Sequence, residues 1–340
     1  MIILNAAVSA AGIGSGETAK GYLSVLSALM LLVLSFVTSK SVQKRLGPGP
    51  SEALAFVCSR SLIATVILFC AYCLINRGIP EVTGYSLLLA FLVSLFSSAY
   101  TMIGFRIMKY GSLSVYTVFL VLGGMIVPYL YGVIFLKEAV SPARIAGVAL
   151  IMISLLFPII GRARSHRKDE NGKSVRVIFV VLCFAVFLLN GMISVITKTH
   201  ASRIFDFPSS DDPTFVMLCS GASFLVSGAA LSALSIYRKI KRGRETASEN
   251  APVENMTSRG TALRSVLVII VLAAIFDAGS FFLQQVGAAN LPASVMFPIQ
   301  TGGSVVLTAL AGFLLFHEKP GKIELIGLIL TFASTFLFLF

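Results

Sequence analysis

The chain is a succession of long apolar stretches separated by short segments that carry most of its charges. Ten such stretches follow one another from residue 21 to the end: Gly21–Ser39, Ala53–Ile75, Val82–Phe105, Tyr110–Leu136, Ile145–Gly161, Val177–Thr197, Pro213–Tyr237, Ser265–Ala289, Asn290–Phe316 and Leu325–Phe340. Most reach the roughly 20 residues that a helix needs to cross a hydrocarbon core of ~30 Å. Only a helix satisfies its own backbone hydrogen bonds in lipid, so the pattern predicts an all-α integral membrane protein with ten transmembrane helices.

The stretches are continuously apolar, which excludes the alternating pattern of an outer-membrane β-barrel. Two of them are interrupted by a charge, Arg60 in the second and Asp277 in the eighth. The eighth and ninth stretches run together without a charge between them. Pro292 separates them, because proline donates no backbone hydrogen bond and restricts the residue before it.

Composition agrees with this interpretation. Of the 340 residues, 56% are hydrophobic and 12% are charged, about half the charged fraction of a typical soluble domain. Such a chain has too little polar surface for a soluble enzyme, a disordered scaffold or a secreted disulfide domain. The five cysteines lie in apolar stretches and predict buried thiols.

The net charge of +12 reflects membrane topology in our interpretation. Twenty of the 27 Lys and Arg residues lie in every second connection, chiefly in the basic loops 162–176 and 238–264. By the positive-inside rule these connections are cytoplasmic, and both termini are then outside. The cations are not interleaved with an aromatic stripe, so we expect no nucleic-acid partner.

An internal repeat relates the two halves of the chain. Residues 114–154 align without a gap on residues 294–334, with nine identities that include three glycines and the pair Glu138 and Glu318. Each half holds five stretches, so the second half enters the membrane in the opposite direction. The sequence therefore predicts two inverted five-helix repeats, an architecture of secondary transporters.

The predicted organisation places a flexible amino-terminal tail at residues 1–20 and the first repeat at residues 21–161. The basic loop 162–176 connects it to the second repeat, residues 177–340. We expect a monomer or a homodimer in the plasma membrane.

Several features of these repeats resemble the drug/metabolite transporter superfamily, in particular its ten-helix EamA-like members. In each half the fourth helix closes in an acidic tag, Lys137-Glu138 and His317-Glu318, and an early glycine follows in the fifth helix, Gly147 and Gly327. Residues 290–294, Asn-Leu-Pro-Ala-Ser, and Arg60 also match the family pattern. The usual tag is Gly-Glu, so Lys137 and His317 depart from it. The resemblance implies a transporter of small organic solutes or metabolites.

An ionisable residue in the middle of a membrane helix is a candidate functional group. Asp277 could couple transport to a proton or recognise a cation, or it could serve as a structural acceptor for a neighbouring helix. Arg60 could meet an anionic group, but we expect it to reach the interface or backbone carbonyls.

Other polar and aromatic residues are candidates for a substrate cavity or its moving walls. For substrate binding we select Asn190, Gln284, Gln300, Tyr100, Tyr116, Phe281 and Phe297 beside Asp277. For gating or structure we select Gly123, Gly124, Pro128, Glu138, Pro298, Gly302, Gly303 and Glu318 beside Arg60.

No catalytic arrangement, zinc signature or nucleotide-binding loop is recognisable, so we expect neither an enzyme nor a bound cofactor or metal. The sequence favours a secondary transporter that works by alternating access and is driven by an ion gradient or by exchange, with a proton as one candidate for the coupling ion. A lipid flippase, or another membrane-embedded protein without transport activity, is the alternative.

Overall fold

A computed structural model describes residues 16–46, 50–107, 113–163, 173–245, 259–316 and 322–339. These residues form ten α-helices and a final 3₁₀ turn, with no β-strand in the described ranges. The helices are α2 (Gly16–Leu46), α3 (Pro50–Asn76), α4 (Gly84–Ile107), α5 (Leu113–Ile134), α6 (Pro142–Ala163), α7 (Lys173–Ala201), α8 (Asp212–Glu245), α9 (Arg259–Asn290), α10 (Ala293–Phe316) and α11 (Lys322–Thr335).

Seven of the described helices are long and apolar enough to cross a membrane, and α5, α6 and α11 contain shorter apolar stretches. The ten helices match the ten predicted stretches one for one, and the protein is a multi-pass membrane protein. Some bounds differ from the prediction. Helix α2 begins at Gly16, inside the predicted tail, and α8 and α9 extend into the predicted loop 238–264. The rest of the tail lies outside the described residues.

Polar side chains fix where several helices begin. Asp211 precedes α8 and accepts the N–H of Thr214 through Oδ1 at 3.2 Å, while the Thr83 hydroxyl accepts the N–H of Ser86 at 3.3 Å at the start of α4. Ser141 acts in the same way before Pro142, the first residue of α6. These are N-caps, in which a side-chain oxygen satisfies a backbone donor that the helix leaves free.

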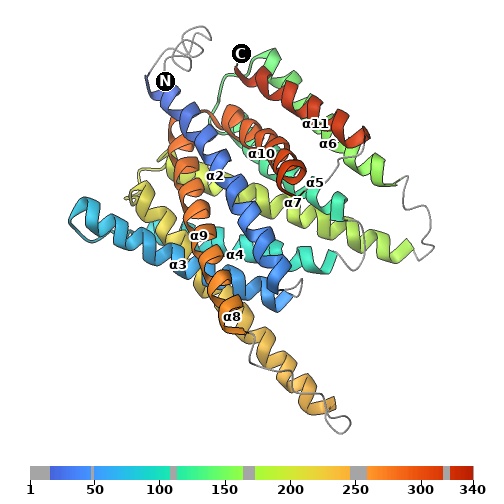
Figure 1. Ribbon diagram of the computed structural model, residues 1–340. Coiled ribbons are helices and arrows are strands. Elements are labelled where there is room, and N and C mark those ends of the chain that lie inside the picture. The colour runs from blue at the N-terminus through green and yellow to red at the C-terminus, as the bar shows by residue number, and fades with distance from the viewer. Residues whose placement is uncertain are drawn as a thin grey trace.

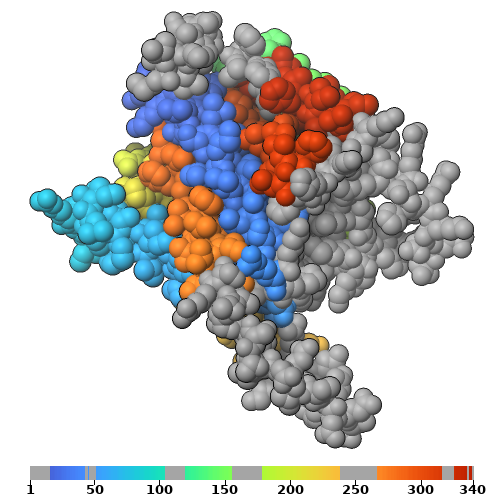
Figure 2. Space-filling view, viewed as in Figure 1, coloured from blue at the N-terminus to red at the C-terminus, as the bar shows by residue number. Residues whose placement is uncertain are grey.

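The packing is symmetric under exchange of the two halves. If α2–α6 are matched in order with α7–α11, contacts of α2 with α9 correspond to those of α4 with α7, and contacts of α5 with α7 correspond to those of α10 with α2. The pairs α3–α8, α5–α10 and α6–α11 each map onto themselves. Figure 1 shows the resulting bundle, and Figure 2 shows α2 (blue) and α9 (orange) side by side along one face.

The two halves run in opposite directions. The beginning of α2 lies at the junction of α9 and α10, where an added Cβ on Gly21 would come within 2.7 Å of Leu291. The end of α7 lies at the same junction, because Lys198 bonds the carbonyl oxygens of Ala288 and Leu291. Since the equivalent helices α2 and α7 begin at opposite ends of the bundle, the repeats are inverted. We call the end with this junction face A and the other end face B.

Glycines allow the halves to approach closely where α5 crosses α7. A Cβ on Gly123 would overlap the carbonyl group of Phe187, and a Cβ on Gly191 would lie 2.9 Å from the Gly123 carbonyl oxygen. At the equivalent crossing of α10 with α2, a Cβ on Gly303 would meet the Leu29 side chain at 2.7 Å. Gly302 is buried beside it, and Pro128 and Pro298 lie inside the same two helices, α5 and α10.

Candidate functional site

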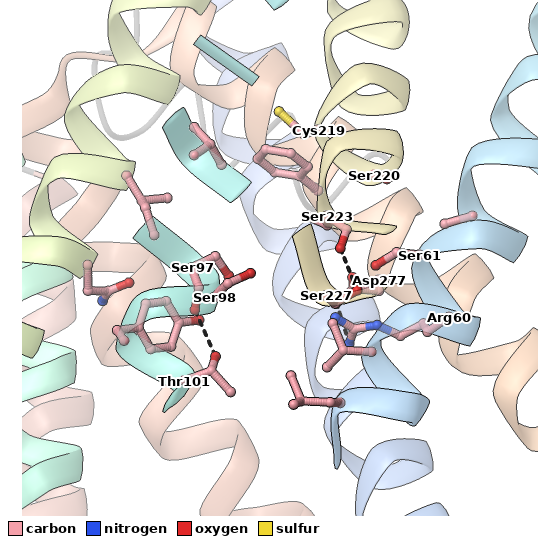
Figure 3. A pocket seen from close by; sticks show the side chains of 18 residues that line it. Arg60, Ser61, Ser97, Ser98, Thr101, Cys219, Ser220, Ser223, Ser227 and Asp277 are labelled. Atoms are coloured by element: carbon pink, nitrogen blue, oxygen red, sulfur yellow. Dashed lines mark hydrogen bonds and ion pairs between the residues drawn. The ribbon is translucent and has the colours of Figure 1, made fainter. Parts of the chain in front are cut away.

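A cavity of about 280 Å³ lies between α3, α4, α7, α8 and α9. Both halves of the chain therefore contribute to its walls (Figure 3). Of the predicted substrate-binding residues, Tyr100, Asn190, Asp277 and Phe281 line it, and Arg60 lies there with them. The structure thus brings together residues that are more than 200 positions apart in sequence.

The cavity extends from the middle of the bundle toward face B. Asn190, Ser223 and Asp277 line it near the middle of their spans, Ile178–Ala201, Asp212–Tyr237 and Val266–Asn290. Its α3 lining begins at Leu54, close to the start of that helix, and its α4 lining ends at Thr101, near the end of that helix. Both of these helix ends belong to face B.

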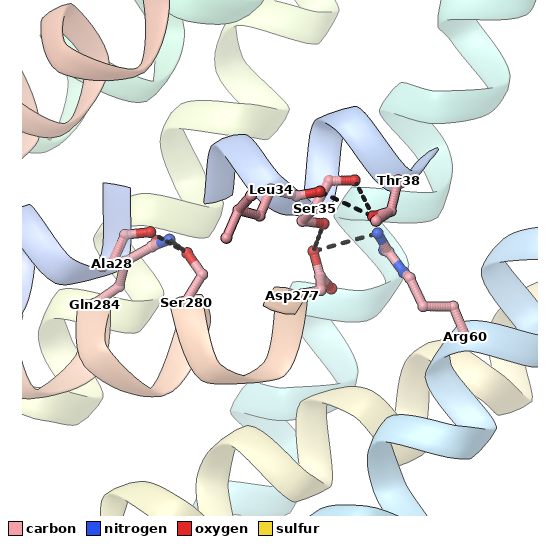
Figure 4. Close-up of polar contacts among 8 residues, drawn as sticks. All are labelled: Ala28, Leu34, Ser35, Thr38, Arg60, Asp277, Ser280 and Gln284. Atoms are coloured by element: carbon pink, nitrogen blue, oxygen red, sulfur yellow. Dashed lines mark hydrogen bonds and ion pairs between the residues drawn. The ribbon is translucent and has the colours of Figure 1, made fainter. Parts of the chain in front are cut away.

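Two opposite charges face each other in this cavity. Arg60 Nη1 lies 3.2 Å from Asp277 Oδ1, and the Ser35 hydroxyl donates to the same oxygen at 3.2 Å (Figure 4). The guanidinium also lies over the Phe56 ring, 5.6 Å from its centroid. Arg60 therefore pairs with a carboxylate on another helix. The prediction that its side chain reaches the interface or backbone carbonyls is wrong. Asp277 is an acceptor for two neighbouring helices and keeps 39% of its side chain exposed.

Hydroxyl groups form most of the remaining polar lining. Seven serine and threonine residues contribute, on α3, α4 and α8: Ser61, Ser97, Ser98, Thr101, Ser220, Ser223 and Ser227. Figure 3 places Ser97, Ser98 and Thr101 across the cavity from the Arg60–Asp277 pair. Such a wall can donate and accept hydrogen bonds without adding charge.

Asn190 joins the cavity to the glycine crossing. Its Nδ2 donates to the Leu120 carbonyl oxygen at 2.8 Å. A Cβ on Gly124 would come within 2.7 Å of that nitrogen, so Gly124 leaves the space that the amide occupies.

The other predicted substrate-binding residues lie elsewhere. Gln300 Nε2 donates to Gln284 Oε1 at 2.5 Å, and Gln284 Nε2 donates to the Ser280 hydroxyl at 3.0 Å. Ser280 in turn donates to the carbonyl oxygen of Ala28 (Figure 4). This series of hydrogen bonds joins α10, α9 and α2, and none of its residues lines the cavity. Phe297 is buried in the apolar core, and the Tyr116 side chain lies outside the described residues.

An apolar plug separates the cavity from face A. It consists of Ala90, Val93, Ile196, Phe215 and Cys219, with partly buried neighbours such as Leu92 and Phe281. Beyond it the Ser86 hydroxyl contacts His200 Nε2 at 3.0 Å and accepts the N–H of Ser210 at 2.9 Å. The His200 ring stacks on Phe215 with centroids 3.7 Å apart.

Glu138 ties the first half of the chain to the second at face A. Its Oε1 accepts the N–H of Ala293 at 2.7 Å, and its Oε2 accepts the N–H of Ser294 at 2.8 Å. A carboxylate at the positive end of the α10 dipole is favourable. The equivalent Glu318 lies outside the described residues.

Neither Lys198 nor His200 is among the residues that the sequence predicted to line or gate the cavity. Both are buried, with 5% and 2% of their surface exposed. Both residues follow the sixth apolar stretch at positions where the same helix can continue. This placement was the signal in the sequence that they could be buried inside the bundle.

Comparisons with known proteins agree with this architecture. The model of the EamA-like transporter family matches residues 212–340. Twenty-eight chains of solved structures match, among them a crystal structure with a TM-score of 0.62 and 15% identity that covers 95% of this chain and 98% of its own; this likeness shows the fold alone. No curated protein matches. The C-terminal part of this membrane protein is thus similar to the EamA-like transporter family.

Proposed function

We propose that the protein is a secondary transporter that moves a small polar organic solute by alternating access, and that the cavity around Arg60 and Asp277 is the solute site. The supporting observation is the position of this cavity between two inverted repeats, with polar lining at mid-span and an apolar plug toward face A. Inverted repeats that enclose a midplane site can expose it to each face in turn.

The charge balance of the lining supports a solute of no net charge. Arg60 and Asp277 neutralise each other, and the other described lining residues are hydroxyl, amide, phenol, thiol or apolar groups. A solute with a net charge would leave an uncompensated charge in a site of low dielectric, which is unfavourable. A zwitterion, or a neutral solute rich in hydroxyl groups, can satisfy both the pair and the serine wall.

The basic connections support an orientation in the plasma membrane. They join the helices at face B, and the positive-inside rule assigns such connections to the cytoplasm. The cavity extends toward that face, so the described conformation is the inward-facing one. Both termini then lie outside. We also propose Asp277 as the coupling group, since a proton there would weaken its bond to Arg60.

Thermal stability against a solute panel tests the assignment of the site. A solute that binds only the folded protein raises the melting temperature by mass action. The purified protein is heated with amino acids, amines, sugars, nucleosides and isoprenoid lipids. We expect one class of neutral polar solutes to raise the melting temperature of the wild type.

Two serines of α8 provide matched variants. Ser220 lines the cavity and donates to the Val216 carbonyl oxygen, whereas the exposed Ser232 donates in the same way to Gly228. Ser220→Leu should abolish the shift and Ser232→Leu should keep it. A shift that survives in Ser220→Leu, or a shift with lipids alone, would contradict the proposal.

A further inference from the structure

The last turn of α7 contacts four other helices at face A. Thr199 shares a hydrogen bond of 3.0 Å with the hydroxyl of Tyr131 on α5. His200 contacts Ser86 on α4 and stacks on Phe215 of α8. Lys198 donates to two carbonyl oxygens at the end of α9. Successive helical residues point about 100° apart, so one turn can reach neighbours on several sides.

The same turn also forms part of the plug. Ile196 is buried against Phe215 and Cys219, next to the wall of the cavity. Because Ile196 and His200 are four residues apart, they lie on one side of α7 and face α4 and α8 together. A movement of this turn away from α4 and α8 would therefore open the plug and break the polar contacts beyond it.

Lys198 is the member of this turn that carries a charge. Its Nζ lies 2.6 Å from the carbonyl oxygens of both Ala288 and Leu291. The end of a helix leaves carbonyl groups without partners inside the helix and has a negative partial charge, so an ammonium group is held firmly there. On the other side of Pro292, the Glu138 carboxylate holds the start of α10.

We propose that the last turn of α7, residues 196–201, is the gate that closes the cavity toward face A, and that Lys198 is its latch on the α9–α10 junction. Tyr131 and Ser86, which belong to the first half of the chain, hold the same turn in place. Opening toward face A requires Lys198 to leave the two carbonyl oxygens. This inference goes beyond the proposed function, because it concerns access to the cavity and holds for any solute.

Sided thiol labelling tests the gate without a known solute. In a variant whose five native cysteines are replaced, Ser98→Cys places a thiol in the cavity, and Glu81→Cys in a separate variant marks face A. A charged, membrane-impermeant methanethiosulfonate is added to cells and to inverted vesicles. In the closed state we expect the cavity thiol to react at least about ten times faster from face B than from face A.

The variant Lys198→Met removes the ammonium group and keeps the length of the side chain. It should raise the labelling rate from face A about tenfold. Lys20→Met, which removes an exposed cation at the same face, should leave that rate unchanged. Tyr131→Phe removes one hydroxyl and should raise the rate about threefold, and it decides the question if Lys198→Met does not fold.

Melting temperatures separate a gate from a merely structural role. An unchanged face A rate in folded Lys198→Met, or in Tyr131→Phe when only that variant folds, would overturn the gate. A fall in melting temperature without a change in sidedness would also overturn it. If no solute of the thermal panel raises the melting temperature of the wild type, the proposed function is refuted. The labelling result is unaffected, because it needs no solute.

Discussion

The carboxylate of Glu138, which follows the end of α5, accepts the backbone N–H of Ala293, the first residue of α10, at 2.7 Å. The bond joins two helices from opposite halves of the chain. It requires space, because a Cβ on Gly132 would lie 2.6 Å from the second carboxylate oxygen. Gly132 and Glu138 recur together in the second repeat as Gly312 and Glu318.

Replacing this cap should destabilise the protein. Glu138→Gln removes the charge and presents an amide NH₂ to one of the two backbone donors, so we expect a loss of about 1–2 kcal/mol of stability. The melting temperature in detergent measures it. Glu81→Gln is the control, because Glu81 is an exposed acid at the same face. Equal melting temperatures for the two variants would refute the capping role.

Replacing Lys137, the residue before Glu138, by glycine should stabilise the protein. Lys137 has a φ of 52°, and the Glu138 N–H that follows it donates to the Gly132 carbonyl oxygen at 3.1 Å, so Lys137 lies in the turn that closes α5. A side chain in this left-handed conformation is disfavoured by about 1–2 kcal/mol relative to glycine. Lys137→Gly should raise the melting temperature, whereas Lys137→Ala, which removes the charge alone, should not. An equal rise in both variants would attribute the effect to charge.

The sequence predicted the fold because bilayer thickness and backbone hydrogen bonding leave few choices for apolar stretches of this length. The repeat of Gly123, Gly132 and Glu138 as Gly303, Gly312 and Glu318 identified the symmetry. The partners within the bundle could not be predicted in the same way. Gln284 and Gln300 differ in no local feature from Asn190, yet they bond each other while Asn190 lines the cavity.

Tertiary packing also decided the environment of Lys198. A lysine at the end of an apolar stretch normally extends to water. Here the end of α9 supplies two carbonyl oxygens within reach, and the side chain is buried. That arrangement depends on how α7 and α9 pack, which no single stretch of sequence encodes.

Adding one methyl group at the α5–α7 crossing should strongly destabilise the protein. A Cβ on Gly123 would overlap the Phe187 backbone, which cannot move aside as a side chain can. We expect Gly123→Ala to lose about 3 kcal/mol or more of stability. Gly84→Ala should be nearly neutral, because nothing lies within 4 Å of its added Cβ. A native melting temperature for Gly123→Ala would contradict the close approach of these helices.

The Arg60–Asp277 pair should show coupling in a double-mutant cycle. Each single variant, Arg60→Met or Asp277→Asn, leaves a partner without its counterpart in the cavity. Because the pair is partly exposed, we expect losses of about 1–2 kcal/mol for each. The double variant should lose less than the sum of the two. Additive losses would show that the two groups do not interact.

Asp277→Asn also tests the coupling role. Uptake driven by a pH gradient into proteoliposomes should be lost, while exchange of solute across the membrane should persist because it needs no net proton movement. Gradient-driven uptake equal to that of the wild type would exclude Asp277 as the coupling group.

Solute counterflow in proteoliposomes tests the central claim most directly. Vesicles loaded with the solute identified in the thermal panel are diluted into labelled solute, and accumulation of the label is followed with time. The account predicts a transient accumulation with the wild type and with Ser232→Leu, and none with Ser220→Leu, which replaces a hydroxyl of the cavity wall by a larger apolar side chain. Undiminished accumulation with Ser220→Leu, in a variant that folds normally, would show that the solute does not pass through this cavity.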